Sequence, residues 1–403
     1  MAKKEKYLVG LDIGSTKTCV LLAEMEDEQV GFLALGAAES KGLRKGLIVN
    51  LDSTVSSIRR AVEEAESVAN VPVESAVIGV AGNHVRGVNS RGGVSLGPRP
   101  RDIEREDVRR AIDTARHISL PEDREVLHVL PHEFRVDAQD GIRDPIGMVG
   151  HRLEANVHVV TASSSATQNL VSAANKAGIL INDTVLEPLA SAEACLTQDE
   201  RELGCCLLDI GGGTTELIVY GGGVVRHTGA VPIGGDHFTN DLAVGLRTPI
   251  PEAERIKRRH GCAATALLRE SGSIEIASVG DRPPRTIFGH ALTEIIEPRA
   301  QELLALLNDD LQRAGLLRQI PAGFVLTGGG ARLHGFLELA EDTFHLPGRI
   351  AQPRGIADLP EQVAQPEYAT VIGLVLSAAK ARRAGSAKPS SLVSKLRSMF
   401  AGA

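Results

Sequence analysis

The sequence predicts an α/β protein with two lobes of related architecture, and three observations support that prediction. The segments 7–20 and 205–219 each contain an apolar strand, then Asp-Ile-Gly, then small hydroxyl residues, then a second β-rich strand. These two hairpin-like segments lie about half the chain apart, which indicates a duplicated fold. The chain has 403 residues, too many for one hydrophobic core.

The composition narrows the class of protein. Apolar residues make up 43% of the chain and charged residues 24%, as in ordinary globular proteins. A net charge of −7 and the scarcity of aromatic residues argue against nucleic-acid binding, because base stacking needs aromatic platforms. The sequence holds no run of about 20 apolar residues, so we expect any membrane contact to be peripheral.

The cysteines and histidines give no sign of a metal centre. The five cysteines are odd in number and scattered, which favours reduced thiols over a disulfide framework. The adjacent Cys205 and Cys206 lie in an apolar run and are expected in the core of a strand. The twelve histidines show no metal-ligand spacing.

Between the two hairpins, the first lobe is predicted to contain two helices and a buried strand. Residues 51–70 have apolar positions at helical spacing, and Asp52 or Ser53 is the expected N-cap. A buried strand is expected at 73–80. A second helix is expected at 161–177, where a glycine follows and suits a C-cap.

The segment 84–161 is predicted to be an inserted α/β subdomain, because its pattern differs from that of its surroundings. It has a Gly- and Arg-rich strand pair at 85–96 and an acidic-basic helix at 105–117. Strand-like runs follow at 126–136 and 153–160.

A second insertion is expected at 229–299, next to a long amphipathic helix at 291–313. A strand at 323–326 then meets a third Gly-rich turn at 328–330, and a final helix begins near Tyr368. The predicted divisions are 1–83 with 162–197 and 360–384 for the first lobe, 84–161 for its insertion, 198–228 with 300–359 for the second lobe, 229–299 for its insertion, 385–390 for a linker and 391–403 for a terminal helix.

The Gly-rich tips have the chemistry of a phosphate site. Glycine lets backbone N–H groups approach a phosphate, and Ser and Thr hydroxyls add donors. A divalent cation on the phosphates needs carboxylate oxygens, usually through water. The tips at 12–18 and 209–215 each supply one Asp, glycines and hydroxyls. Asp12 and Asp209 are the strongest candidates, since a carboxylate between apolar strands has little structural purpose.

Five motifs occur in the order found in the actin, Hsp70 and sugar-kinase superfamily, and the chain resembles that superfamily over nearly its whole length. They are the two tips at 12–18 and 209–215, the turn at 325–332, and the segments 187–192 and 369–373. The last two resemble the helices that connect the lobes in that superfamily.

The resemblance implies that ATP with Mg²⁺ binds in a cleft between the lobes. It implies that Asp12 and Asp209 hold the hydrated Mg²⁺ and that Glu187 positions a hydrolytic water. The other residues that it places around the phosphates, ribose and base are Gly14, Ser15, Thr16, Lys17, Gly211, Gly212, Gly213, Thr214, Thr215, Gly234, Gly235, Asp236, Glu254, Lys257, Gly328, Gly329, Gly330 and Arg332.

Ordinary structure also accounts for some of these residues. A Gly-rich turn such as 328–330 is common in plain loops. Glu187 precedes a proline and also suits the first turn of a helix. Glu254 and Lys257, at i and i+3, also fit a surface ion pair. Whether the protein is an enzyme is therefore left open, with a weak ATPase as the most that the motifs support.

The position of the first insertion distinguishes between the families of this superfamily. It lies between the strand at 73–80 and the helix at 161–177, and it resembles the subdomain that the FtsA family of bacterial cell-division proteins has in place of actin's usual insertion. The segments 41–52 and 234–243 are also similar to FtsA.

The FtsA resemblance implies a location and partners. It implies a peripheral protein at the cytoplasmic face of the bacterial inner membrane, at the division site. The implied partners are the C-terminal tail of FtsZ on 229–299, later division proteins on 84–161, and other copies of the chain in filaments. Two alternatives stay open: a pilus-assembly scaffold of the PilM kind, which shares the insertion, and an ATP-turnover enzyme such as a kinase.

The last thirteen residues are predicted to form an amphipathic helix that anchors the protein to the membrane. Apolar residues recur at i, i+1, i+4, i+7 and i+8, and two cations lie on the opposite face. These residues are Leu392, Val393, Leu396, Met399 and Phe400, with Lys395 and Arg397 opposite. A helix packed on the protein or on a partner is the alternative. One such tail binds weakly, so we expect multivalent binding by a polymer.

Overall fold

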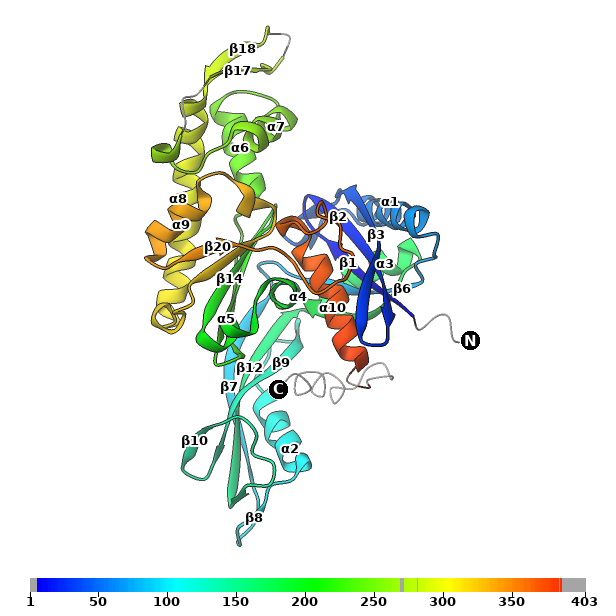
Figure 1. Ribbon diagram of the computed structural model, residues 1–403, viewed down its shortest axis with the longest axis vertical. Helices are drawn as coiled ribbons and strands as arrows, with labels where there is room; N and C mark the ends of the chain where they lie inside the picture. Colours follow the sequence, from blue (N-terminus) through cyan, green and yellow to red (C-terminus); the bar gives the residue numbers. More distant parts are fainter. Residues whose placement is uncertain (1–5, 269–271, 281, 384, 386–403) are drawn as a thin grey trace.

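The computed structural model describes residues 6–268, 272–280, 282–383 and 385. Each lobe contains a sheet of five strands within this part of the chain (Figure 1). The first sheet has β1 (Tyr7–Ile13), β2 (Lys17–Glu26), β3 (Gln29–Glu39), β6 (Ser75–Val80) and β13 (Leu180–Leu186). The second has β14 (Cys205–Ile210), β15 (Thr215–Gly221), β16 (Val224–Val231), β19 (Phe324–Thr327) and β20 (Gly348–Ile350).

The two sheets have the same topology. In the first, the order is β13-β6-β1-β2-β3, with β1–β2 and β2–β3 antiparallel and β1–β6 and β6–β13 parallel. In the second, the order is β20-β19-β14-β15-β16, with the same sequence of parallel and antiparallel pairs. The duplicated α/β fold predicted from the repeated hairpins is therefore confirmed.

Helices cover both sheets, and those expected at 51–70, 161–177, 291–313 and from Tyr368 are present. The first-lobe helices are α1 (Leu51–Ala69), α3 (Ser164–Ala177), α4 (Glu187–Cys195) and α10 (Ala369–Arg383). The second-lobe helices are α5 (Gln198–Leu203), α8 (Gly289–Arg313) and α9 (Phe336–Phe344). The N-cap expected for α1 was wrong. Asn50, one residue before the helix, accepts the backbone N–H of Ser53, because its side-chain oxygen reaches the orphan donors of the first turn.

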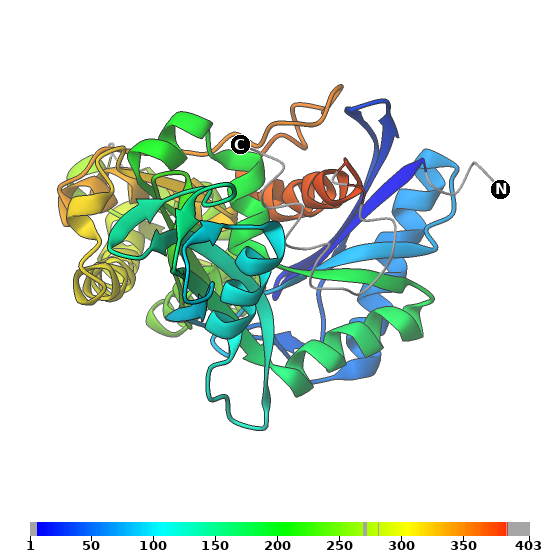
Figure 2. The same ribbon diagram turned by 90° about the horizontal axis from the view of Figure 1, so that it is seen from below.

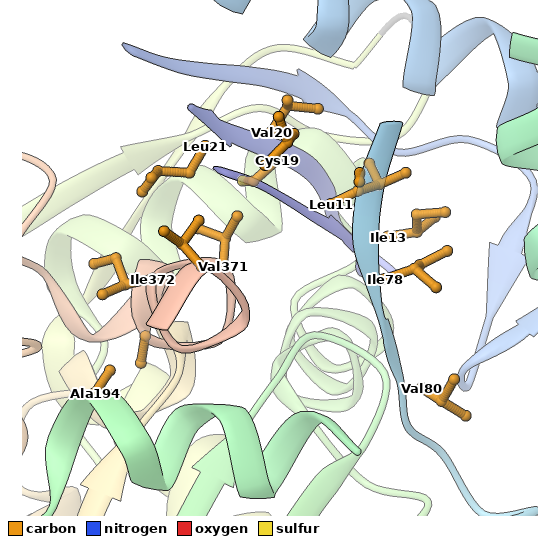
Figure 3. Close-up of a cluster of buried hydrophobic side chains, with 14 of the residues drawn as sticks. Leu11, Ile13, Cys19, Val20, Leu21, Ile78, Val80, Ala194, Val371 and Ile372 are labelled. Atoms are coloured by element: carbon orange, nitrogen blue, oxygen red, sulfur yellow. The ribbon is translucent and has the colours of Figure 1, made fainter. Parts of the chain in front are cut away.

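The core of the first lobe lies between its sheet and α10, and it continues into the second lobe. Figure 3 shows Cys19 and Leu21 of the first hairpin facing Val371 and Ile372 of α10, whereas Leu11 lies with Ile13 and Ile78 on the other side of the sheet. The same buried cluster includes residues of α4, β14, β15 and β19. Helices α4 and α10 pack side by side between the two sheets (Figures 1 and 2). They are thus the elements through which the two lobes share one core.

The first insertion is a small α/β subdomain that extends away from the lobes (Figure 1). Its sheet has the order β10-β9-β12-β7, and α2 packs against β7 and β12. Its elements are β7 (Arg86–Ser95), β8 (Arg101–Asp102), α2 (Arg105–Arg116), β9 (Arg124–Val136), β10 (Gln139–Ile142), β11 (Val149–Gly150) and β12 (Arg152–Ser163). The expected strand pair at 85–96 was wrong: this stretch is one strand, and its partner is β12.

The second insertion begins with α6 (Gly235–Gly245) and α7 (Ile250–His260) and ends with the hairpin of β17 (Ser273–Ile276) and β18 (Arg285–Phe288). These elements lie at the opposite end of the molecule from the first insertion (Figure 1). A short hairpin, β4 (Leu43–Arg44) with β5 (Leu47–Ile48), completes the described strands. Among the described residues, no helix is both long and apolar enough to cross a bilayer.

The cysteine predictions are confirmed. All five thiols are free and buried. Cys205 and Cys206 lie in β14 and are fully buried in the cores of the molecule. Burial raises the pKa of the Cys205 thiol to about 12, which keeps it protonated and unreactive at neutral pH.

Candidate nucleotide-binding site

The tips of the β1–β2 and β14–β15 hairpins face each other across the boundary between the lobes. A Cβ atom added to Gly212 would lie 1.8 Å from Oγ1 of Thr16, and one added to Gly213 would lie 2.6 Å from Oγ of Ser15. Because no side chain fits at these distances, glycine is required for the two tips to approach. The Thr16 hydroxyl is buried, and Oγ1 has no hydrogen-bond partner among the described residues.

The two aspartates lie at equivalent places, each near the end of the first strand of its hairpin. Both are 8% exposed. Oδ2 of Asp209 accepts the hydroxyls of Ser191 at 2.6 Å and Thr370 at 3.2 Å, from α4 and α10. Burial raises the pKa of Asp12 to about 6, against the opposing effect of Lys17. Burial also raises the pKa of Asp209, and the two hydroxyl bonds oppose that rise.

Two glutamates add to this group of buried acidic side chains. Glu187 is the first residue of α4, and burial, with Asp12 as the next cause, raises its pKa well above the ordinary value. Gly79 makes room for this side chain, since a Cβ there would lie 2.7 Å from Cγ of Glu187. Glu216 is directly opposite Asp209 in the β14–β15 register, and burial and Asp209 raise its pKa to about 8.

Lys17 and the third Gly-rich turn meet at one side of the tips. The Lys17 ammonium donates to the backbone carbonyl of Glu367 and lies 3.7 Å from the centre of the Tyr368 ring. Arg332 forms an ion pair with the Glu367 carboxylate at 2.6 Å. Gly328 has φ +78°, and a Cβ there would lie 2.5 Å from Oδ1 of Asp209. The predicted turn at 328–330 therefore lies directly beside Asp209.

The predicted residues of the second insertion lie on the other side of the second tip. The N–H groups of Gly235 and Asp236 donate to the carbonyls of Gly211 and Gly212 at 2.9 and 2.8 Å. Behind them is a second ion pair: Lys257 Nζ lies 2.6 Å from Oε2 of Glu254, and it also donates to the Gly235 carbonyl at 2.9 Å. Glu254 and Lys257 thus do form the i, i+3 pair considered above, and this pair buttresses the start of α6.

The residues present fit a nucleotide with a divalent cation. Burial raises the pKa of four acidic side chains here, and a cation bound beside them would favour their ionised forms. Among the described residues, no group of three or more His, Cys, Asp and Glu side chains is arranged to hold a metal ion directly. The carboxylates therefore suit a cation bound through water and phosphate oxygens. The glycines of both tips and the unpaired Thr16 hydroxyl supply the donors that phosphate needs.

Several contributing residues were missed by the sequence reasoning. Ser191 and Thr370 lie within the two connecting helices that the motifs identified, and a hydroxyl in an otherwise apolar helix was the available signal. Glu216 was an acidic residue within an apolar strand, but only the strand register reveals that it faces Asp209. The predicted membrane residues 392–400 lie outside the described residues.

Comparison with known families matches two regions of the chain. The family model described as "Cell division protein FtsA" matches residues 206–373. The model described as "SHS2 domain inserted in FTSA" matches residues 82–161, the first insertion. Among solved structures, a PilM–PilN type IV pilus biogenesis complex is similar with a TM-score of 0.68 at 19% identity, covering 92% of this chain and 98% of that one.

A second solved structure, MreB5 of Spiroplasma citri bound to ADP, has a TM-score of 0.57 at 13% identity and covers 95% of this chain and 99% of that one. At these identities the likenesses establish the actin-like fold alone. Curated relatives share more sequence. Cell division protein FtsA of Pseudomonas aeruginosa is 45% identical over 92% of this chain and 89% of its own. FtsA of Escherichia coli K12 is 37% identical over 93% and 90%. The chain therefore belongs to the FtsA family of cell-division proteins.

Proposed function

We propose that the protein binds ATP with Mg²⁺ between the two hairpin tips, and that it uses this actin-like body to tether FtsZ filaments to the membrane. Asp12 and Asp209 hold the hydrated cation. Its positive charge offsets the negative charge of the phosphates and carboxylates. Lys17 and the backbone N–H groups of the first tip contact the β- and γ-phosphates. The backbone at 211–215 contacts them from the second lobe.

One observation supports nucleotide binding above all others. Two glycine-and-hydroxyl tips from opposite lobes meet beside a cluster of buried carboxylates. Buried like charges of this kind destabilise a protein unless a ligand offsets them. A cluster of buried acidic side chains that lowers stability in this way indicates a ligand that carries a cation.

Glu187 is proposed to position a hydrolytic water, which makes the protein at most a weak ATPase. Its carboxyl is buried beside Asp12 and Asp209, near the proposed phosphates. Its raised pKa favours the protonated form, which is a poor base, unless a cation in the cleft lowers that pKa. Slow turnover is the result we expect from this environment.

The proposed FtsZ-binding surface lies on the second insertion, within 229–299. Four large apolar side chains there are each more than half exposed: Val244, Ile250, Val279 and Phe288. Large apolar side chains exposed on one subdomain favour a peptide-binding surface. Later division proteins are proposed to bind the first insertion, and copies of the chain to assemble into filaments.

The membrane anchor is proposed to be the amphipathic segment 391–403, joined to the body by the linker 385–390. This would place the protein at the cytoplasmic face of the inner membrane, at the division site. The domain limits predicted above stand as part of this proposal. Deleting residues 391–403 should abolish co-sedimentation with vesicles of anionic phospholipid. Unchanged sedimentation would rule out the anchor.

The nucleotide proposal is tested by measuring the affinity for Mg²⁺-ATP of the wild type and of Asp209→Ala. We expect a loss of about 100-fold, or about 2.7 kcal/mol, because the variant removes a buried cation-binding carboxylate. Asp310→Ala is the matched control, since Asp310 accepts a bond from His227 at 2.9 Å on α8, away from the tips. Equal affinities of wild type and Asp209→Ala would refute the site.

The FtsZ surface is tested with a synthetic peptide of the FtsZ C-terminal tail. Val244→Asp should weaken peptide binding about tenfold, because it places a charge within the apolar surface. Val68→Asp, at a position 65% exposed on α1, is the control. Equal weakening by both variants would place the binding surface elsewhere.

A further inference from the structure

The sheet of the first insertion has an open edge at β7. In the sheet order β10-β9-β12-β7, this strand pairs only with β12 among the described residues. It is 10 residues long, has no proline or lysine, and keeps one unbroken register with β12. Figure 1 shows β7, in light blue, running from the lobes along the insertion. A long, regular edge strand is a template for pairing with another chain.

The register shows which backbone groups of β7 point away from the sheet. Just after β7, the N–H of Leu96 donates to the carbonyl of His151 at 2.8 Å, in the same register. The even-numbered residues of β7 therefore bond to β12, and the odd-numbered residues turn their N–H and C=O groups outward. The outward residues are Gly87, Asn89, Arg91, Gly93 and Ser95. Among the described residues, none of their backbone N–H and C=O groups makes a hydrogen bond.

Other sheet edges of the molecule are protected against such pairing. On β3, the N–H of Phe32 donates to the carbonyl of Ala357 at 2.9 Å, and the N–H of Ala37 donates to the Glu64 carboxylate at 2.8 Å. Strand β13 has an irregular register with its neighbour, and β10 is irregular and only 4 residues long. Within the described part of the chain, β7 has none of these protections. Its open edge is therefore the exception that needs a reason.

The neighbouring elements cover the faces of β7 and leave its edge accessible. The second lobe packs on one face, where the side chain of Asn89 donates to the carbonyl of Arg226 at 3.4 Å. Helix α2 covers the other face at Gly92. Three of the outward residues, Asn89, Arg91 and Ser95, are nevertheless exposed. An extended peptide can therefore reach the outward backbone groups without displacing either neighbour.

The charge along the edge selects the kind of peptide. Arg86 and Arg91 of β7 are exposed, and the strand carries no acidic residue. Glu154 of β12 pairs with both Arg91 and Arg152, so two guanidinium groups share one carboxylate that is 14% exposed. Positive charge is therefore left over at the edge. A second copy of β7 would bring arginines against arginines, whereas an acidic strand is complementary.

We propose that the open edge of β7 binds an extended acidic peptide of a partner protein, which adds to the 4-stranded sheet of the insertion as a further strand. The outward backbone groups provide hydrogen bonds to any extended peptide, and Arg86 and Arg91 favour one rich in glutamate or aspartate. This inference rests on one part of the proposed function, the binding of other proteins to the first insertion. It uses neither the nucleotide site nor the proposed FtsZ surface.

Amide hydrogen exchange of the full chain, resolved to single residues, tests the geometry. The probe is a synthetic peptide of about ten residues in which glutamate alternates with valine, matched to the length of the strand. Without the peptide, the outward amides of β7 should exchange faster than the even-numbered amides that bond to β12. Saturating peptide should slow the outward set at least about tenfold and leave the even-numbered set unchanged.

Two altered peptides separate the contributions of backbone and charge. A fully N-methylated peptide keeps the charges but has no N–H to donate, so it should bind at least about tenfold more weakly. A peptide with lysine in place of glutamate keeps the amides, and repulsion from Arg86 and Arg91 should weaken its binding by a similar factor. Fluorescence anisotropy of labelled peptides measures all three affinities.

Substitutions in the protein test the same edge. Arg91→Gln should weaken binding of the acidic peptide about threefold, and that difference should vanish at high salt. Arg109→Gln, the same change at an exposed arginine of α2, is the matched control and should leave the affinity unchanged. Arg91→Pro also removes an outward N–H at a position where an edge strand tolerates proline, so it should weaken binding about tenfold. Thermal unfolding checks that each variant is folded.

Equal binding of the N-methylated peptide would overturn the proposal, because strand addition needs the peptide's amides. Equal binding of the lysine peptide would overturn the acidic occupant. Dimerisation of the chain that Arg91→Pro abolishes would make a second copy the occupant instead. Peptide binding without slower exchange in β7 would refute this inference and leave the first insertion as a binding surface. Failure of the acidic peptide to bind would also refute it, and the ATP and FtsZ-tail measurements would then show separately whether the rest of the proposed function holds.

Discussion

Two regions of the molecule bury ionisable groups, and they do so in opposite ways. The cleft holds Asp12, Glu187, Asp209 and Glu216, whose pKa values burial raises. The contact between the first insertion and the second lobe holds a cluster of histidines. Burial lowers the pKa of His158 to about 3 and that of His132 to about 4. The cleft groups are acids close to one another, whereas the interface groups are bases kept neutral.

The hydrogen bonds explain the difference. His158 donates from Nδ1 to Asn89 Oδ1 at 2.7 Å and accepts at Nε2 from Thr228 at 2.8 Å, so its neutral ring is fully satisfied within the chain. The ring of His132 stacks on that of His158 with 6.0 Å between the ring centres, and its Nε2 has no partner among the described residues. In the cleft, Oε1 of Glu216 and Oγ1 of Thr16 have no hydrogen-bond partner among the described residues. The neutral His158 ring thus uses its whole hydrogen-bonding capacity within the chain, whereas the cleft keeps acceptor and hydroxyl groups that a ligand could engage.

The largest effect that we expect separates these two roles directly. His158→Ala should lower the free energy of unfolding by about 3–4 kcal/mol, because it opens a cavity and leaves Asn89 and Thr228 unpaired. Its affinity for Mg²⁺-ATP should stay within about threefold of wild type. Denaturant unfolding and nucleotide titration measure the two quantities, with the exposed His151→Ala as control. A tenfold loss of ATP affinity would show that the interface is part of the ligand site.

The second effect concerns the cleft and its dependence on pH. The folded-state pKa of Glu216, about 8, lies above its ordinary value of 4.5. Between these two pH values, folding therefore takes up a proton. The contribution of Glu216 to the free energy of unfolding is full below pH 4.5 and is lost as the pH rises to 8. Glu216→Gln, which imitates the protonated acid, should be more stable than wild type by roughly 3 kcal/mol at pH 7. The advantage should shrink toward pH 4.5. A constant difference across this range would mean that Glu216 does not titrate in the folded protein.

The same comparison explains which features the sequence could predict. Local pattern was enough for the hairpins, for several helices and for the place of Asp12 and Asp209 beside the hairpin tips, because Gly, Asp and apolar periodicity act over a few residues. It was not enough for Glu216 or His158, whose partners lie on other strands or in another lobe. The strand pair expected at 85–96 failed for the same reason, since β7 pairs with β12 across about 60 residues of intervening sequence. Strand register and the packing between lobes depend on the tertiary structure, which local sequence pattern does not specify.

The third effect concerns the stability of the protein at acidic pH. His132 has a folded-state pKa of about 4, below its ordinary value of 6.5. The unfolded chain therefore binds the proton, and the stability present above pH 6.5 is lost as the pH falls toward 4. His132→Phe should flatten the fall in unfolding free energy between pH 6.5 and 5 by about 1 kcal/mol. Chemical denaturation at a series of pH values measures it, and an unaltered slope would assign the acid sensitivity to other groups.

The smallest effect tests whether surface charge shares the task of the histidines. Arg143, just after β10, forms an ion pair at 3.0 Å with Glu202 of α5, so it too joins the insertion to the second lobe. These side chains are 68% and 38% exposed, and water and salt screen such a pair. Glu202→Gln should therefore change the free energy of unfolding by less than about 0.5 kcal/mol, and the change should vanish at high salt. A loss as large as that of His158→Ala would mean that the rim of the interface, and not its buried histidines, holds the insertion in place.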